Sequence, residues 1–182
     1  MKESLVIHRI TLNRPDRKNA IDASFLEQLR AANADDSVRV VLIEATGTVF
    51  CCGADPDLPP EVWRFRDWMT KPVVCAVQGA ALSEGVALLA NSHVVVAAQG
   101  SSFGLVEVRE GRWPLGFPAI ASAIGERRAT ELALTGRVFG TNDALQMGLV
   151  QEVAPAFEYD DRAEALAAHL AGLDLTGRLP IS

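Results

Sequence analysis

The stretch QGAALSEGVALLAN, residues 78–91, places a single carboxylate, Glu84, in a turn between two apolar segments. A helix that begins near Glu84 would direct its unpaired backbone N–H groups and the positive end of its dipole out of that turn. The stretch FCCGAD, residues 50–55, can supply another N–H group, because Gly53 permits a tight turn in which the amide of Ala54 faces a ligand. Two such amides at one point form an oxyanion hole, which stabilises negative charge developing on a carbonyl oxygen. The two turns therefore predict acyl chemistry.

A nucleophilic serine is a second interpretation of the same turn. The sequence ALSEG is similar to the nucleophile elbow of esterase-type enzymes, with Ala81 in place of the first glycine. Acidic residues and a histidine follow Ser83 in the chain order of those enzymes: Asp143, Asp161 and His169. An elbow serine directly follows a strand, however, and residues 79–82 separate Ser83 from the apolar segment 73–77. The sequence therefore ranks a serine hydrolase well below the electrostatic interpretation.

Hydrophobic patterns predict the elements that position these turns. Apolar and β-branched runs predict five strands, at residues 4–12, 38–45, 73–77, 94–98 and 149–154. Asp22 is expected to cap a first helix whose inner face carries Phe25, Leu26, Leu29 and Ala32. Further helices are expected at residues 61–69, at 85–90, from Glu126 to Gly136, from a Thr141 cap to Gly148, and at 161–171. This alternation indicates an α/β protein with parallel strand pairing.

The composition limits the remaining possibilities. The 182 residues suffice for one domain, and 49% hydrophobic residues suffice for a sizeable core. A net charge of −6 argues against nucleic acid as the main partner. Polar residues interrupt the apolar run 73–98, so we expect no membrane span. The three cysteines, of which Cys51 and Cys52 are adjacent, have neither disulfide nor metal spacing, so reduced thiols in a cytoplasmic, metal-free protein are expected.

Five segments resemble, in order, blocks of the enoyl-CoA hydratase/isomerase (crotonase) family. They are ITLNRPDRKNAI, VRVVLIEATGTVFCCGAD, KPVVCAVQGAAL, FGLVEVREG and ERRATELALTGRVFGTNDALQMGLVQEV. The resemblance covers about residues 4–154. It implies an α/β fold with a crotonase-like ββα-spiral core over residues 1–154 and a truncated C-terminal helical region, a short tail over residues 155–182. It also implies an acyl-CoA thioester ligand, with coenzyme A part of the substrate rather than a separate cofactor, and a homotrimer or hexamer.

The resemblance assigns roles to individual residues. In the family, two backbone amides hold the thioester oxygen, and the matching positions here are Ala54 and Glu84, the latter in place of a glycine. Family hydratases use two glutamates, of which Glu107 matches one. The other position is occupied here by Ala87, which has no acid–base capacity. Without the family resemblance, Glu107 is interpreted as a solvated carboxylate or as the ion-pair partner of Arg109 or Arg112.

The loop RPDRKNA, residues 14–20, matches the segment along which family members hold coenzyme A. The resemblance implies backbone contacts around Ala20, Ala54 and Asp55, with Arg17 or Lys18 as phosphate partners. A single glutamate suffices to move a double bond from C3 to C2, because one base can remove a C2 proton and return it at C4. We therefore expect double-bond isomerisation rather than hydration. The alternative is a catalytically inactive paralogue that only binds acyl-CoA or serves a structural role.

Overall fold

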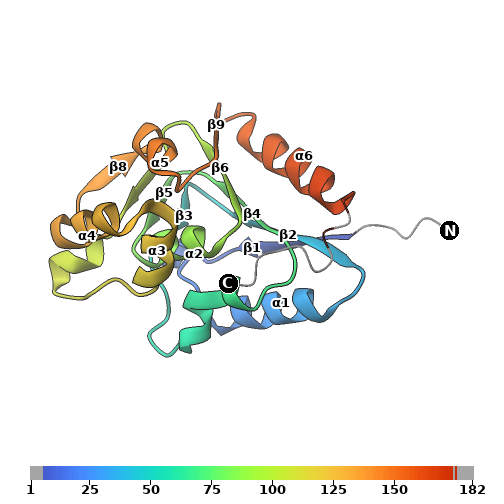
Figure 1. The fold of residues 1–182 in the computed structure, drawn as a ribbon, viewed down its shortest axis with the longest axis horizontal. Coiled ribbons are helices and arrows are strands. Elements are labelled where there is room, and N and C mark those ends of the chain that lie inside the picture. Colours follow the sequence, from blue (N-terminus) through green and yellow to red (C-terminus); the bar gives the residue numbers. More distant parts are fainter. Residues whose placement is uncertain (1–5, 174, 176–182) are drawn as a thin grey trace.

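Five runs of apolar residues form a parallel sheet at the centre of the protein. The computed structural model describes residues 6–173 and 175. The sheet has the order β1-β2-β4-β6-β9, and every neighbouring pair in it is parallel (Figure 1). Its strands are β1 (Val6–Leu12), β2 (Val38–Ala45), β4 (Val73–Val77), β6 (Val94–Ala98) and β9 (Glu152–Ala154). The α/β class with parallel pairing is therefore confirmed, although residues 4 and 5 of the first predicted strand lie outside the described residues.

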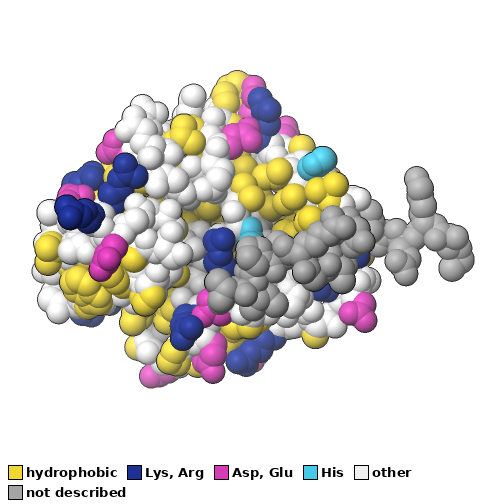
Figure 2. All heavy atoms as spheres, in the orientation of Figure 1, with side chains coloured by type: hydrophobic (Ala, Val, Ile, Leu, Met, Phe, Trp, Pro, Cys, Tyr) yellow, Lys and Arg dark blue, Asp and Glu magenta, His cyan; other side chains and the backbone are white. Residues whose placement is uncertain are grey.

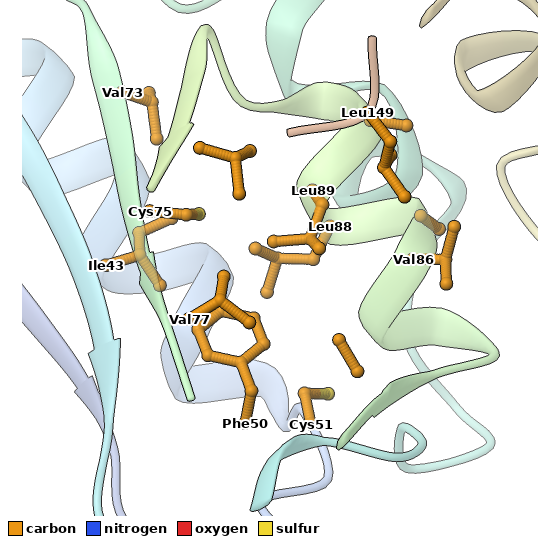
Figure 3. Close-up of a cluster of buried hydrophobic side chains, with 14 of the residues drawn as sticks. Ile43, Phe50, Cys51, Val73, Cys75, Val77, Val86, Leu88, Leu89 and Leu149 are labelled. Atoms are coloured by element: carbon orange, nitrogen blue, oxygen red, sulfur yellow. The ribbon is translucent and has the colours of Figure 1, made fainter. Parts of the chain in front are cut away.

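The two faces of this sheet pack against different helices, because successive side chains of a strand point to opposite sides. One face contributes Ile43, Val73, Cys75 and Val77 to the larger buried cluster, which these residues share with α2 (Glu84–Asn91) (Figure 3). The opposite face contributes a second cluster under α6 (Tyr159–Ala171), whose members from the sheet are Val40, Leu42, Val74, Ala76 and Val96. The last helix of the described chain therefore covers the sheet on the face away from α2.

A second sheet, of three-residue strands, was not predicted from the sequence. Its order is β3-β5-β7-β8, with β3 (Val49–Cys51), β5 (Ala80–Leu82), β7 (Ser102–Gly104) and β8 (Val138–Gly140). The first three strands are parallel, and β8 pairs antiparallel with β7. Such short strands carry no usable alternation in the sequence. Because β3, β5 and β7 run in the same direction, the residues that follow them emerge at one edge of the sheet.

The remaining helices lie around these sheets. They are α1 (Ala23–Ala34), α3 (Phe117–Ile124), α4 (Glu126–Thr135), α5 (Thr141–Met147) and the 3-10 helices η1 (Pro15–Arg17), η2 (Pro60–Asp67) and η3 (Val106–Glu110). The predicted cap of α1 is confirmed, because the side chain of Asp22 accepts a hydrogen bond from the backbone N–H of Ser24. The four residues expected on its inner face are all buried.

Several details of the predicted elements were wrong. The helix expected at residues 61–69 is the 3-10 segment η2, which is kinked at Arg64 where φ is −140°. Thr141 does not cap α5, since it is the first residue of the helix and Gly140 takes the cap position without a side-chain bond. The last strand is shorter than the expected 149–154, and the helix α3 was missed.

No helix in the described part of the chain is long and apolar enough to cross a membrane. On the face shown in Figure 2, acidic and basic side chains are interspersed, without the single-sign stripe that characterises many nucleic-acid-binding surfaces.

Candidate active site

Three loops that leave the same edge of the second sheet bring the predicted site residues together. Ala54 follows β3, Glu84 follows β5 and begins α2, and Glu107 lies in η3 directly after β7. The register pairs Cys51 with Ala81 and aligns the end of β5 with the end of β7. Ligand sites of parallel sheets commonly form at the carboxyl ends of the strands, and this edge has that geometry.

The amides of Ala54 and Glu84 are both free of protein acceptors among the described residues. Ile21 hydrogen-bonds to both neighbours of Ala54, donating to the carbonyl of Gly53 at 3.0 Å and accepting from the N–H of Asp55 at 2.8 Å, so the amide of Ala54 itself stays unused. Glu84 is the first residue of α2, where a backbone N–H has no partner within the helix. Both N–H groups are therefore available to a ligand oxygen.

The close approach of α2 to β3 depends on Gly85. A Cβ atom at that position would lie 2.2 Å from the carbonyl oxygen of Cys51, a backbone atom that cannot turn aside. Only glycine allows this contact, which seats the first turn of α2 against β3 and holds the amide of Glu84 beside the loop of Ala54.

The side chain of Glu84 is turned towards an arginine. Only 7% of it is exposed, and its Oε1 lies 3.6 Å from Nη1 of Arg112. Arg112 also contacts Oε2 of Glu110 at 3.0 Å, and about half of its side chain is exposed. Glu84 is thus a buried, ion-paired carboxylate at the first turn of α2, where the helix dipole also favours negative charge. The sequence suggested Arg112 only as a partner of Glu107, and its pairing with Glu84 was missed because nothing local links it to a residue 28 positions earlier.

Glu107 is the second buried carboxylate of the site. The residue is 2% exposed, and its Oε2 atom has no hydrogen-bond partner in the part of the chain that the structure describes. Burial raises the pKa of Glu107 above its ordinary value, and the charge of Glu84 adds to this, whereas a hydrogen bond with the Ser83 side chain and the charge of Arg112 oppose it. A desolvated, unpaired carboxyl oxygen with a raised pKa is suited to general acid–base catalysis.

The alternative of an ion pair between Glu107 and a nearby arginine does not describe the structure. Arg109 donates to the carbonyl oxygen of Gly136 at 2.6 Å, and Arg112 pairs with Glu84 and Glu110. Glu107 has no salt bridge within 4 Å among the described residues. Its carboxylate is also not solvated, because the residue is almost completely buried.

Ala87 lies one helical turn after Glu84 and is completely buried. It packs so closely against Gly116 that a Cβ atom at position 116 would lie 2.9 Å from the Cβ atom of Ala87. The position that holds a glutamate in family hydratases is therefore filled by an alanine that is part of the core. Nothing in the sequence pattern pointed to Gly116 as the neighbour that fills this space.

The loop expected to bind coenzyme A is tied to the strand edge described above. Nη1 of Arg14 donates to the carbonyl oxygen of Ala20 and to Oδ2 of Asp55, both at 3.0 Å, and the N–H of Cys52 donates to the carbonyl oxygen of Lys18 at 3.0 Å. The structure thus brings Ala20 and Asp55 close to Ala54. Arg17 and Lys18 are exposed at the same loop, where their charges can meet a solvated ligand.

Asn19 fixes this loop and was missed in the sequence. The residue is 1% exposed; its Nδ2 donates to the carbonyl oxygens of Thr46 and Val49, at 2.8 and 2.7 Å, and its Oδ1 accepts from the N–H of Arg14 at 2.9 Å. Its φ of 54° is tolerated better by asparagine than by most residues.

Replacement of Asn19 by alanine is therefore expected to lower the free energy of unfolding by about 2–3 kcal/mol, because buried carbonyl oxygens lose their donors. Asn13→Ala, in the same loop at an exposed position, is the matched control and should cost well below 1 kcal/mol. Chemical denaturation of both variants measures the difference. Equal losses in the two variants would show that Asn19 does not anchor the loop.

The structure changes the interpretation of Ser83 in two ways. The strand β5 ends at Leu82, so the expectation that no strand directly precedes Ser83 was wrong. The histidine expected to complete a triad, His169, lies in α6, which packs on the far face of the five-stranded sheet. The Ser83 side chain instead affects Glu107, whose pKa it lowers.

The chain is similar to known proteins in both sequence and fold. The sequence profile described as enoyl-CoA hydratase/isomerase matches residues 2–58 and 61–175. The chain is 33% identical to the 1,2-epoxyphenylacetyl-CoA isomerase of Escherichia coli and 32% identical to its 2,3-dehydroadipyl-CoA hydratase, in each case over 89% of this chain and 71% of the relative. The crystal structure of an enoyl-CoA hydratase from Mycobacterium avium superposes with a TM-score of 0.83 at 33% identity, over 96% of this chain and 80% of that one. An enoyl-CoA hydratase structure from Bacillus anthracis gives a TM-score of 0.84 at 27% identity, over 93% and 74% of the two chains.

Proposed function

Because this chain belongs to the enoyl-CoA hydratase/isomerase family, we propose that it binds acyl-CoA thioesters and moves the double bond of a 3-enoyl-CoA into conjugation with the thioester. The proposal rests on one observation: among the described residues, two amides without acceptors and one buried carboxyl oxygen without a partner occur together at the same edge of the second sheet. The amides belong to Ala54 and Glu84, and the carboxyl oxygen is Oε2 of Glu107.

The chemistry begins when the thioester oxygen accepts hydrogen bonds from the two amides. Glu107 removes a proton from C2, and the electron pair moves onto the thioester oxygen as an enolate, whose charge the amides stabilise. The same carboxyl group then returns the proton at C4, which leaves the double bond between C2 and C3. Donors fixed by the backbone need no reorganisation when the charge develops, so they favour the transition state over the bound substrate.

Isomerisation is favoured over hydration because the second glutamate position is closed. Hydration needs a group that handles the attacking water as well as one that handles the C2 proton. Ala87 cannot do so, because its methyl side chain carries no ionisable group, and the residue is completely buried. The carboxylate of Glu84 is occupied by its ion pair with Arg112.

The nucleotide end of the ligand is assigned to the loop of residues 14–20. Arg17 and Lys18 would meet its phosphates, and the backbone around Ala20 and Asp55 would contact the rest of coenzyme A. Coenzyme A enters as part of the substrate, so the proposal includes no further cofactor. A cytoplasmic location belongs to the same proposal, as does assembly into trimers or hexamers, which the molar mass in solution from light scattering would test.

An ultraviolet assay tests the proposal directly, because conjugation of the double bond with the thioester produces a new absorbance. Wild-type protein is expected to generate the conjugated 2-enoyl thioester from a 3-enoyl-CoA. The alternative, an inactive paralogue, has support in the buried carboxylate of Glu84, whose charge opposes a developing enolate. Binding of the 3-enoyl-CoA without any conjugation would select that alternative and reject the isomerase.

The pH dependence of the rate follows from the environment of Glu107. The base must be ionised, and its pKa is raised above the ordinary value of 4.5, so kcat/KM is expected to fall on the acid side at a pH above 4.5. Arg112 lowers this pKa, so Arg112→Gln should move the acid limb to higher pH. Arg64→Gln, which removes an exposed arginine paired with Asp67, is the control and should leave the profile in place. A shift to lower pH in Arg112→Gln would contradict the assignment of Glu107 as the base.

A further inference from the structure

Ser83 lies at the centre of the site, and isomerisation gives its hydroxyl group no chemical role. The residue is 5% exposed, and its side chain lowers the pKa of Glu107. Its hydroxyl group does not cap α2, although Ser83 occupies the cap position of that helix. The hydroxyl group of Ser83 is therefore buried near a carboxylate and does not stabilise the end of the helix. Its role must be a different one.

The backbone of Ser83 has the conformation of a sharp turn between a strand and a helix. Its φ and ψ are 53° and −115°, a combination that non-glycine residues rarely adopt. The strand β5 ends at the preceding residue and α2 begins at the following one. A nucleophile elbow has this strand–turn–helix context, in which the strained turn presents the serine oxygen at the end of the strand.

The positions of the free amides match the same arrangement. In an elbow, the residue after the nucleophile donates one N–H group to the oxyanion, and a neighbouring loop donates the other. Here the residue after Ser83 is Glu84, and the neighbouring loop carries Ala54; both amides are unpaired.

A second and independent feature of the site points to a reacting ligand. Oε2 of Glu107 is buried and unpartnered, in a residue that is 2% exposed. A carboxyl group in this state, with a pKa that responds to the Ser83 side chain, can accept the hydroxyl proton as the oxygen attacks. Burial raises the pKa of Glu107, which makes its carboxylate a stronger base than an exposed one.

We propose that Ser83 is an acyl-accepting nucleophile and that the site hydrolyses acyl-CoA thioesters, with Glu107 as the general base. The proposal rests on acyl-CoA binding at the proposed site but not on isomerisation. In the first half-reaction, the Ser83 oxygen forms a bond to the thioester carbon, its proton passes to Glu107, and the carbonyl oxygen becomes an oxyanion held by the two amides. The carbon–sulfur bond then breaks, and the sulfur of coenzyme A leaves as a thiol with the proton from Glu107.

In the second half-reaction, water attacks the acyl-serine ester and Glu107 takes a proton from the water. The bond to the Ser83 oxygen breaks, the proton returns to that oxygen, and a carboxylic acid leaves. No oxidant or further reactant is needed. The same base therefore serves both half-reactions, as it would serve both proton transfers of the isomerisation.

The test uses a saturated thioester, butyryl-CoA, which has no double bond to move, and a small alkyl fluorophosphonate. Peptide mass spectrometry locates the fluorophosphonate adduct, and a thiol reagent measures release of free coenzyme A. Ser83→Gly removes the hydroxyl group while keeping the backbone conformation, since glycine readily adopts a φ of 53°. Ser92→Ala is the matched control: Ser92 is equally buried, lies at the other end of α2 and donates to the carbonyl oxygen of Leu88.

We expect one adduct per chain, on Ser83, and thiol release that falls about 100-fold or more in Ser83→Gly and Glu107→Gln but not in Ser92→Ala. The absence of an adduct on Ser83 would overturn the proposal. So would thiol release at the wild-type rate by Ser83→Gly, or an adduct without thiol release from butyryl-CoA. Conjugation of a 3-enoyl-CoA by wild-type protein, measured in parallel, separates the two proposals. If the adduct and thiol release are found without conjugation, only the isomerase proposal is rejected. If conjugation is found without the adduct and without thiol release, only the proposal of a nucleophilic Ser83 is rejected.

Discussion

Substitution of Glu107 by glutamine is expected to lower the conjugation of a 3-enoyl-CoA by about 100- to 10,000-fold, the range that general acid–base catalysis contributes. Glutamine has nearly the shape of glutamate but can neither accept the C2 proton nor return it. The loss should appear in kcat more than in KM, because the amides of Ala54 and Glu84 still bind the thioester oxygen. Steady-state ultraviolet kinetics measure both constants.

The same substitution makes a separate prediction about stability. The pKa of Glu107 is raised in the folded protein, so between the ordinary and the raised value the folded state binds more protons than the unfolded state. Its contribution to stability is then fully present below the ordinary pKa of 4.5 and is lost as the pH rises through the raised value. Glutamine does not ionise, so Glu107→Gln does not lose stability as the pH rises. Its free energy of unfolding in urea at neutral pH should therefore be at least as large as that of the wild type.

Glu110 offers a control for the activity prediction, because it is a carboxylate of the same segment that is not expected to act as the base. Glu110 lies in the same 3-10 helix and pairs with Arg112, but 71% of its side chain is exposed. Glu110→Gln is expected to change kcat less than threefold. Comparable losses in Glu110→Gln and Glu107→Gln would show that the rate depends on the general charge of the segment rather than on one base.

The substitution Gly85→Ala is expected to have the largest effect on the fold of the site. Its Cβ would lie 2.2 Å from the carbonyl oxygen of Cys51, so either α2 or β3 must shift. We expect the free energy of unfolding to fall by about 3 kcal/mol or more, at the upper end of the cost of overpacking. Any shift of α2 also moves the amide of Glu84, so conjugation activity should be lost in the protein that remains folded.

Gly140→Ala serves as the comparison for this experiment. A Cβ atom at Gly140 would meet no atom within 4 Å, and its φ of −98° suits any residue. Because Gly140 is the cap residue of α5, where alanine is less favourable than glycine, this variant should lose about 1 kcal/mol or less. Thermal denaturation of both variants tests this prediction. If Gly85→Ala is as stable as Gly140→Ala, the close contact between α2 and β3 does not determine the position of α2.

Much of the fold could be predicted from local sequence patterns and from the order of the motifs. The central strands are long enough to show apolar runs, and α1 has a capping aspartate before an amphipathic face, so these elements were predictable. The three-residue strand β5 was not, because Ala80–Leu82 has no alternation of its own and pairs only with residues distant in sequence. Missing β5 is also what made a nucleophilic Ser83 look unsupported.

The contacts between residues of the site were harder to predict from the sequence than the identities of those residues. The positions of Ala54, Glu84 and Glu107 followed from a family resemblance that the comparisons confirm. The ion pair of Glu84 with Arg112 and the filling of space around Ala87 by Gly116 are contacts between separate elements. Such contacts depend on how α2, η3 and α3 are packed, which no periodicity within one segment records.

Exchange of the C2 protons of a saturated acyl-CoA in D2O, followed by nuclear magnetic resonance, tests most directly whether this site stabilises a thioester enolate. It requires no double bond and no leaving group, only removal and return of the proton by Glu107. Wild-type protein is expected to replace C2 protons by deuterium, whereas Glu107→Gln is expected to leave them in place. Absence of exchange in the wild type, under conditions where equilibrium dialysis shows the acyl-CoA bound, would contradict this prediction.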